Sequence, residues 1–419
     1  MNKPLNIKLT LSIVLLAAVM VLRDLFGLGI NQVLILGLIG IAAVILPYNE
    51  LFCFTSFVAP VACGINGYAI TILLLALYAK SKRKIISQFL PAIVLIFVEL
   101  LHSSIYAFSF SREFLYFSNI ALFFFCSNDT NDVDPQKVVK SFIYGTALCC
   151  LLIIGRTYII NGSFSAIFLD NARIGSVMGE NEMETKGLTH MVLNANSLAY
   201  ISLLGTTCLL FGRKVLNLGK IPYYSLLILL LLGGAITVGR TWLLVLCAIL
   251  LLYVFSSSVK RKIGFVFFIL TGLVVVAQTE MLNSLFSVIT ESFSVRFSSN
   301  LMQAGGRTDL WNEYMQIWIS DISYIICGIS APNYRLLFPN INAIHNIIQQ
   351  IFVCTGIIGL SVYVIFGVNI IRNSLRANTK FLFYLPLIAA FVYLQSIPVL
   401  ADWILILPVF PCIYALKIK

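Results

Sequence analysis

The sequence predicts an all-α protein, a polytopic transmembrane helical bundle, and three observations carry this prediction. Of the 419 residues, 60% are hydrophobic and only 11% are charged, with a mean hydropathy of +0.97. Continuous apolar runs of about 20 residues, each long enough to cross a bilayer core, recur along the whole chain. Lysine and arginine gather in short stretches between these runs. A soluble domain of this size could not cover its surface with so few polar residues.

The apolar runs predict the helices in chain order. Near the N-terminus, the runs 6–22, 29–47 and 67–79 are plain, whereas 51–65 is short and contains Pro60. The first run has no signal-peptide cleavage pattern and is expected to be a retained helix. The later helices are expected at 85–106, 112–127, 137–160, 188–211, 222–238, 240–257, 261–279, 343–371, 379–397 and 402–416. The total is about 12–14 spans in one membrane domain over residues 1–419.

Basic clusters predict the topology. They occur at Lys80–Lys84, Arg213–Lys220, Lys260–Lys262, Arg372–Lys380 and the C-terminal Lys417 and Lys419. Alternation of the helices places all of them on one face, which the positive-inside rule makes cytoplasmic. Much of the net charge of +11 is therefore a topology signal, and no nucleic-acid partner is expected.

No metal site or disulfide framework is expected. The ten cysteines fall almost all inside apolar runs without CxxC spacing, which indicates packed apolar side chains. The segment Asp132–Asp134 matches a DxD pattern, but the topology places it in a cytoplasmic turn ahead of Pro135. Asp24 is a lone acid near an uncertain helix boundary.

Two long loops, about 161–187 and 280–342, lie on the opposite, outer face, and connections of this length are usually functional. That face carries arginine with almost no lysine, Lys186 being the clear exception. The arginines are Arg112, Arg173, Arg296, Arg307 and Arg335, with Arg156 and Arg240 near the same boundary. Guanidinium groups bind phosphate oxygens bidentately, so the set predicts a phosphate site. Pairing with acids of the same loops, or contact with lipid headgroups, is the alternative for any single arginine.

Arg240 lies in a very short turn, between "GGAITVG" and "TWLLVLCAILLLYVF". An ionisable residue at that depth is costly and is a functional candidate by default, the alternative being an interfacial anchor.

The second loop contains "AGGRTDLWNEY". Gly305 and Gly306 allow a close backbone approach ahead of Arg307. Thr308 or Asp309 is expected to cap a helix that continues through Trp318 along the outer membrane interface.

His345, one of three histidines, is expected in the first turn of a helix that starts near Asn342. There the helix dipole favours the neutral imidazole, which can act as a general base beside a phosphate site. Asn346 would orient substrate or cap the helix. A capping or interfacial histidine is the alternative, and His102 and His190 are weaker candidates.

These motifs together resemble the O-antigen polymerase and ligase superfamily. The resemblance rests on "GGR" in a long outer loop, "GIS" at Gly328, "HN" opening a helix with "GIIGL", "VGRTWLLVL" and "NANSLAYISL". It covers about residue 85 to the end, and it departs from the family where Gly239 replaces the usual serine and where "NAIHN" replaces a richer histidine stretch.

The resemblance implies a GT-C-like fold in the bacterial inner membrane, with a periplasmic active site. It implies glycan transfer from undecaprenyl diphosphate to a hydroxyl group, without metal or cofactor. Arg240 and Arg307 would then bind diphosphate, with Arg173 and Arg335 beside them, and His345 would be the base. Asn346, Asp309, Gly305 and Gly306 would support them. A chain-length regulator and a flippase are the implied protein partners.

Three functions stay open on the sequence. A polymerase joins lipid-linked repeat units of O-antigen or capsule, and a ligase transfers glycan to lipid A core. The third is a transporter of lipid-linked or anionic solutes, which would show broken helices and ionisable residues deep in several spans. The sparse histidine motif favours the polymerase.

Overall fold

The computed structural model describes most of the chain, and every regular element in the described part is a helix. The described residues are 7–65, 67–82, 88–103, 109–129, 133–161, 195–256, 287, 290, 291, 294, 307–334, 344–377, 379–397 and 403–418. The predicted all-α fold class is confirmed. The predicted helix at 261–279, nearly all of the first outer loop and about half of the second lie outside the described residues.

The helices follow the apolar runs closely. In the first part of the chain they are α1 (Ile7–Met20), the π-helix η1 (Val21–Leu25), α2 (Gln32–Ile45), α3 (Tyr48–Val58), the 3-10 helix η2 (Ala59–Gly64), α4 (Gly67–Lys80), α5 (Leu90–Ser103), α6 (Phe110–Ser127) and α7 (Pro135–Asn161). In the second part they are α9 (Ala195–Leu209), α10 (Lys220–Ala235), α11 (Arg240–Ser256), α14 (Arg307–Ile319), α15 (Ile322–Cys327), α17 (Ile347–Arg376), η4 (Phe381–Tyr384), α18 (Leu385–Tyr393), η5 (Trp403–Ile406) and α19 (Val409–Ala415).

Two of the described helices are long and apolar enough to cross a membrane. They are Pro135–Arg156 within α7 and Ile347–Arg376, which is α17. Other apolar helices of the described part have 10–17 residues. At about 1.5 Å per residue, a 14-residue helix such as α2 is about 21 Å long, shorter than the roughly 30 Å hydrocarbon core.

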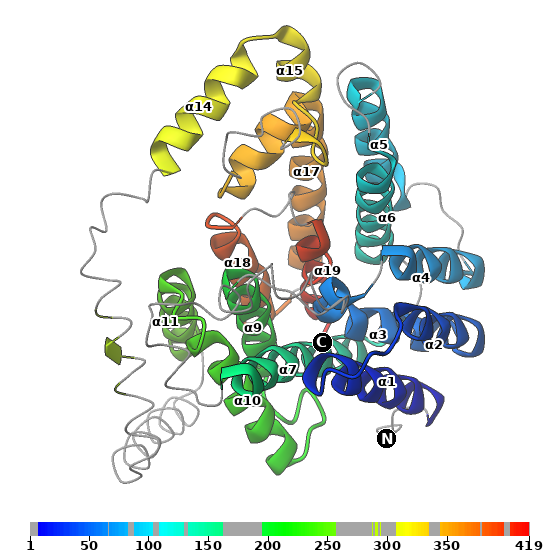
Figure 1. The fold of residues 1–419 in the computed structure, drawn as a ribbon. Coiled ribbons are helices and arrows are strands. Elements are labelled where there is room, and N and C mark those ends of the chain that lie inside the picture. The colour runs from blue at the N-terminus through cyan, green and yellow to red at the C-terminus, as the bar shows by residue number, and fades with distance from the viewer. Residues whose placement is uncertain are drawn as a thin grey trace.

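Helix α9 is the buried centre of one group of helices, and it packs against α7, α10 and α18 (Figure 1). All of its residues except Asn196 are buried. Small and hydroxyl side chains line this close contact. For example, Ser202 Oγ donates a hydrogen bond to the Leu230 carbonyl of α10 at 2.6 Å.

A second group consists of α5, α6, α15 and α17, which pack side by side (Figure 1). The α15 end crosses α17 at two glycines with positive φ, Gly328 (83°) and Gly356 (63°). A Cβ on Gly356 would lie 2.3 Å from the carbonyl oxygen of Ile326, so only glycine fits this crossing. Gly356 has non-helical φ and ψ and therefore breaks α17 into two pieces.

Asp24 is not the lone acid that the sequence predicted. The Arg23 guanidinium donates to both Asp24 carboxylate oxygens at 2.7 Å, and both residues are buried. Arg23 Nη2 also donates to the Gly64 carbonyl at 2.7 Å, which ties η1 to the end of η2. The ten cysteines are free thiols, most of them buried, as the sequence predicted.

Candidate functional site

His345 lies immediately before the capped N-terminus of α17. Asn346 is the N-cap residue, and its side chain accepts a hydrogen bond from the Gln349 N–H at 3.0 Å. The predicted cap is therefore confirmed, but the predicted first-turn position of His345 is wrong. The helix begins at Ile347 because the Asn346 side chain satisfies a free N–H of the first turn there. His345 is half-buried and follows the buried Ile344.

Two other helices hold the beginning of α17. The Ile347 N–H donates to the carbonyl of Leu394, at the end of α18, at 3.0 Å. From the other side, Gln349 Nε2 donates to the Trp311 carbonyl of α14 at 2.8 Å. The rings of Trp318 and Phe352 lie with their centroids 4.0 Å apart and fasten α14 to the next turn. His345 therefore stands beside a helix end that α14 and α18 hold in place.

Arg240 is the first residue of α11 and follows a turn of residues 236–239. The predicted short turn between two apolar helices is confirmed. Gly234 makes the turn possible, since a Cβ there would overlap the Trp242 ring at 2.0 Å. Arg240 is half-buried, and α11 packs on α9 and α18. Helix α18 thus packs against α11, which begins at Arg240, and its end is hydrogen-bonded to the first residue of α17.

Gly239 also has a structural reason. A Cβ at this position would lie 3.2 Å from Thr237 Oγ1 and 3.8 Å from the Cβ of Ala199 on α9. Thr237 Oγ1 is itself fixed, because it donates to the Gly234 carbonyl at 2.6 Å. The turn therefore leaves little space for the serine that the resembled family carries here.

The remaining predicted site residues are only partly within the described structure. Helix α14 includes Arg307, so Thr308 and Asp309 both lie within it, and the predicted cap at Thr308 or Asp309 is wrong. The side chains of Arg307 and Asp309 lie outside the described part. Gly305, Gly306, Arg173 and Arg335 fall outside it entirely.

A buried carboxyl cluster, which the sequence reasoning missed, lies between α5, α6 and the segment after α15. We define it as Glu99, Glu113, Ser330, Ala331 and Asn333. Ser330 Oγ donates to one Glu99 carboxyl oxygen at 2.5 Å, and the Ala331 N–H donates to the other at 2.9 Å. Asn333 Nδ2 donates to Glu113 Oε1 at 2.6 Å, and the Asn333 N–H donates to Ser330 Oγ at 3.1 Å.

Burying two acids is costly unless their oxygens are hydrogen-bonded, and the hydrogen bonds of the carboxyl cluster offset this cost. All four polar side chains are nearly inaccessible, with exposures from 0% to 3%. Ser330 has a φ of 83°, a strained value for a residue other than glycine. The cluster therefore fixes the segment 328–334 against α5 and α6. A glutamate in the apolar run 85–106 was the signal that could have revealed it.

Among the described residues, no group of three or more His, Cys, Asp or Glu side chains is arranged to hold a metal ion. No family model matches the chain, and no curated protein matches it.

Proposed function

We propose that the chain is a polytopic protein of the bacterial inner membrane, with about 12–14 spans and a GT-C-like fold. The two long apolar helices and the shorter apolar helices of the described part support this proposal. The composition supports it too, since 60% of all residues are hydrophobic. The shorter helices would then reach the membrane surfaces through their flanking residues or lie in a locally thinned bilayer.

The proposed activity is that of a glycan polymerase. It would join undecaprenyl-diphosphate-linked repeat units of O-antigen or capsule at the periplasmic face. One observation carries this proposal: a half-buried histidine stands beside the capped start of α17, and α18 connects that helix end to α11, which Arg240 opens. A base and a phosphate-binding group on rigid, connected helix ends suit a transfer reaction at fixed depth.

The chemistry assigns one step to each group. As the acceptor hydroxyl oxygen attacks the anomeric carbon of the donor glycan, His345 takes the hydroxyl proton. The bond between that carbon and the diphosphate oxygen breaks, and undecaprenyl diphosphate leaves with the electron pair. Arg240, with Arg307, Arg173 and Arg335 as proposed partners, would stabilise the growing negative charge on the leaving group.

The test is an in vitro reaction that contains only the purified protein and undecaprenyl-diphosphate-linked repeat units. A ladder of products without added lipid A core supports the polymerase, and transfer only when core is added identifies the ligase. His345→Ala should lower the polymerisation rate by about 10²- to 10⁴-fold and leave donor binding largely unchanged. If His345→Ala polymerises within a few-fold of the wild type, the histidine has no role as a base.

Arg240→Lys tests the phosphate role, because lysine keeps the charge but loses the two-pronged guanidinium contact. We expect a loss of most activity with normal membrane insertion. The matched control is Arg213→Lys, which makes the same exchange in the loop between α9 and α10. Equal activity of both variants would contradict the assignment of Arg240.

One observation favours the transporter as a second candidate. Helix α17 is broken at Gly356, and broken helices line the binding sites of many transporters. Vesicles that contain the purified protein separate the two functions. A transporter moves a labelled lipid-linked glycan across the bilayer without forming longer products, whereas a polymerase forms them.

A further inference from the structure

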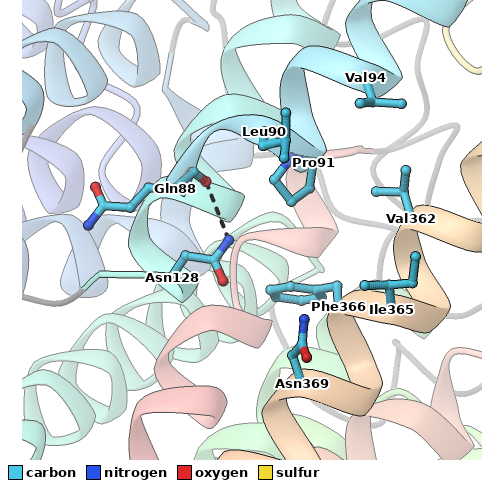
Figure 2. Close-up of a pocket in the computed structure, with 9 residues that line it drawn as sticks. All are labelled: Gln88, Leu90, Pro91, Val94, Asn128, Val362, Ile365, Phe366 and Asn369. Carbon is cyan, nitrogen blue, oxygen red and sulfur yellow. Dashed lines mark hydrogen bonds between the residues drawn. The ribbon is translucent and has the colours of Figure 1, made fainter. Parts of the chain in front are cut away.

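A ligand-sized pocket lies between α5, the end of α6 and the second half of α17, away from His345. Its volume is about 480 Å³, within the range of about 300–1,000 Å³ that is usual for ligand pockets. Figure 2 shows the apolar side chains of α5 and α17 around it, with Asn128 and Asn369 at the end away from Val94. The lining residues are Gln88, Leu90, Pro91, Val94, Asn128, Val362, Ile365, Phe366 and Asn369.

The pocket is built from rigid parts. The ring of Phe366 packs edge-on against Phe123 and Phe124 of α6, with centroids 5.7 Å and 4.9 Å apart. Asn128 Nδ2 donates to the Gln88 carbonyl at 3.3 Å, which joins the end of α6 to the residues before α5 (Figure 2). The walls are thus fixed by ring packing and a hydrogen bond, and none of the described lining residues carries a charged side chain.

Basic residues continue the same stripe of α17 beyond the pocket. Val362, Ile365, Phe366 and Asn369 are spaced by three, one and three residues, the spacing of one helix face. The next positions on that face are Arg372 and Arg376, and both side chains are exposed. Along one face of α17, the apolar side chains of the pocket are therefore followed by the Asn369 amide and then by the two arginines. That order matches the acyl chain, the glycerol region and the phosphate of a phospholipid.

We propose that this pocket binds an anionic membrane phospholipid. One acyl chain would occupy the apolar part, the amides of Asn128 and Asn369 would bond the ester or glycerol oxygens, and Arg372 and Arg376 would bind the phosphate. The inference rests on the membrane location of the proposed function, and it is independent of the polymerase activity.

The pocket is separate from the candidate transfer site. Asn369 lies about 18 Å along the helix beyond Ile357, the first residue after the break. His345 precedes the other end of α17. The basic cluster Arg372–Lys380 belongs to the face that the topology assigns to the cytoplasm. The bound lipid would thus come from the inner leaflet, where anionic headgroups attract such residues.

The experiment measures lipid retention. The full-length protein is reconstituted in vesicles of phosphatidylcholine with one fifth phosphatidylglycerol, extracted in mild detergent, and analysed by native mass spectrometry. We expect the wild type to retain phosphatidylglycerol in clear preference to phosphatidylcholine. The double variant Arg372→Gln, Arg376→Gln should reduce this preference by roughly thirty-fold, as two lost headgroup contacts imply. Its matched control is Lys214→Gln, Lys220→Gln, which removes two exposed charges near α10.

A second pair of variants tests the acyl part. Val362→Trp fills the pocket and should abolish retention, whereas Val364→Trp adds the same ring at an exposed position of α17 and should not. Equal retention of the two lipids by the wild type, or equal loss in both charge variants, would overturn the proposal. Millimolar inorganic phosphate is a further test. If it lowers phosphatidylglycerol retention as much as removal of the two arginines does, the pocket holds a simple anion site and the proposal is overturned. Retention of neither lipid would also overturn the lipid site, whereas failure of the protein to incorporate into the vesicles would contradict the membrane location on which the inference rests.

Discussion

Replacing Glu99 should show that the carboxyl cluster holds the segment ahead of Arg335 and His345. In Glu99→Ala, the Ser330 hydroxyl and the Ala331 N–H lose their acceptor while they stay buried. Each buried donor left without a partner costs about 1–3 kcal/mol, so the free energy of unfolding should fall by about 2–6 kcal/mol. Glu99→Gln keeps one acceptor oxygen and should cost roughly half as much.

The assay is equilibrium unfolding in mixed detergent micelles, followed by circular dichroism. The double variant Glu99→Ala, Ser330→Ala removes both side chains of one hydrogen bond, and the coupling energy should be about 0.5–3 kcal/mol. Leu100→Ala is the control, because Leu100 is a neighbour on α5 with 43% exposure and no place in the cluster. If Glu99→Ala costs no more than Leu100→Ala, or if the two cluster changes are additive, the cluster does not hold the segment.

Three further predictions concern the α17 break, the buried ion pair and metal dependence. Gly356→Ala should lower the free energy of unfolding by about 2–5 kcal/mol, because a Cβ meets the Ile326 carbonyl at positive φ. Gly367→Ala, with open space around its Cβ, should have little effect in the same denaturant series. Arg23→Met should cost about 3–5 kcal/mol by leaving Asp24 buried beside an apolar chain, and Asp24→Asn in the same background should restore part of the loss. Polymerisation in millimolar chelator should proceed at nearly the untreated rate, and restoration of a lost rate by magnesium would contradict this.

The helices could be predicted because apolar runs and helix punctuation are local signals. The turn before Arg240 and the cap at Asn346 are confirmed for this reason. Helix starts were harder to predict, since Asn342 and Asn346 are equally good N-cap residues by sequence. Only the structure shows that the Asn346 side chain accepts the N–H of the first turn. The prediction placed His345 inside the first turn, and the structure places it before the cap.

The site contacts could not be predicted because they join distant segments. Glu99 and Ser330 are separated by 231 residues, and nothing local in either segment names the other. The Arg23–Asp24 pair escaped for a different reason. Adjacent residues of a helix point in different directions, so a bond between Arg23 and Asp24 is not expected from their positions alone.

The break at Gly356 divides α17 into two helical pieces that meet at this one residue. The shorter piece, from Ile347 to Thr355, is hydrogen-bonded to α14 and to the end of α18. The longer piece, from Ile357 to Arg376, places Phe366 against α6 and against the proposed lipid pocket. Because Gly356 also lies tightly against the Ile326 carbonyl of α15, the angle between the two pieces is fixed, and the end beside His345 keeps its place relative to the Phe366 side of the helix.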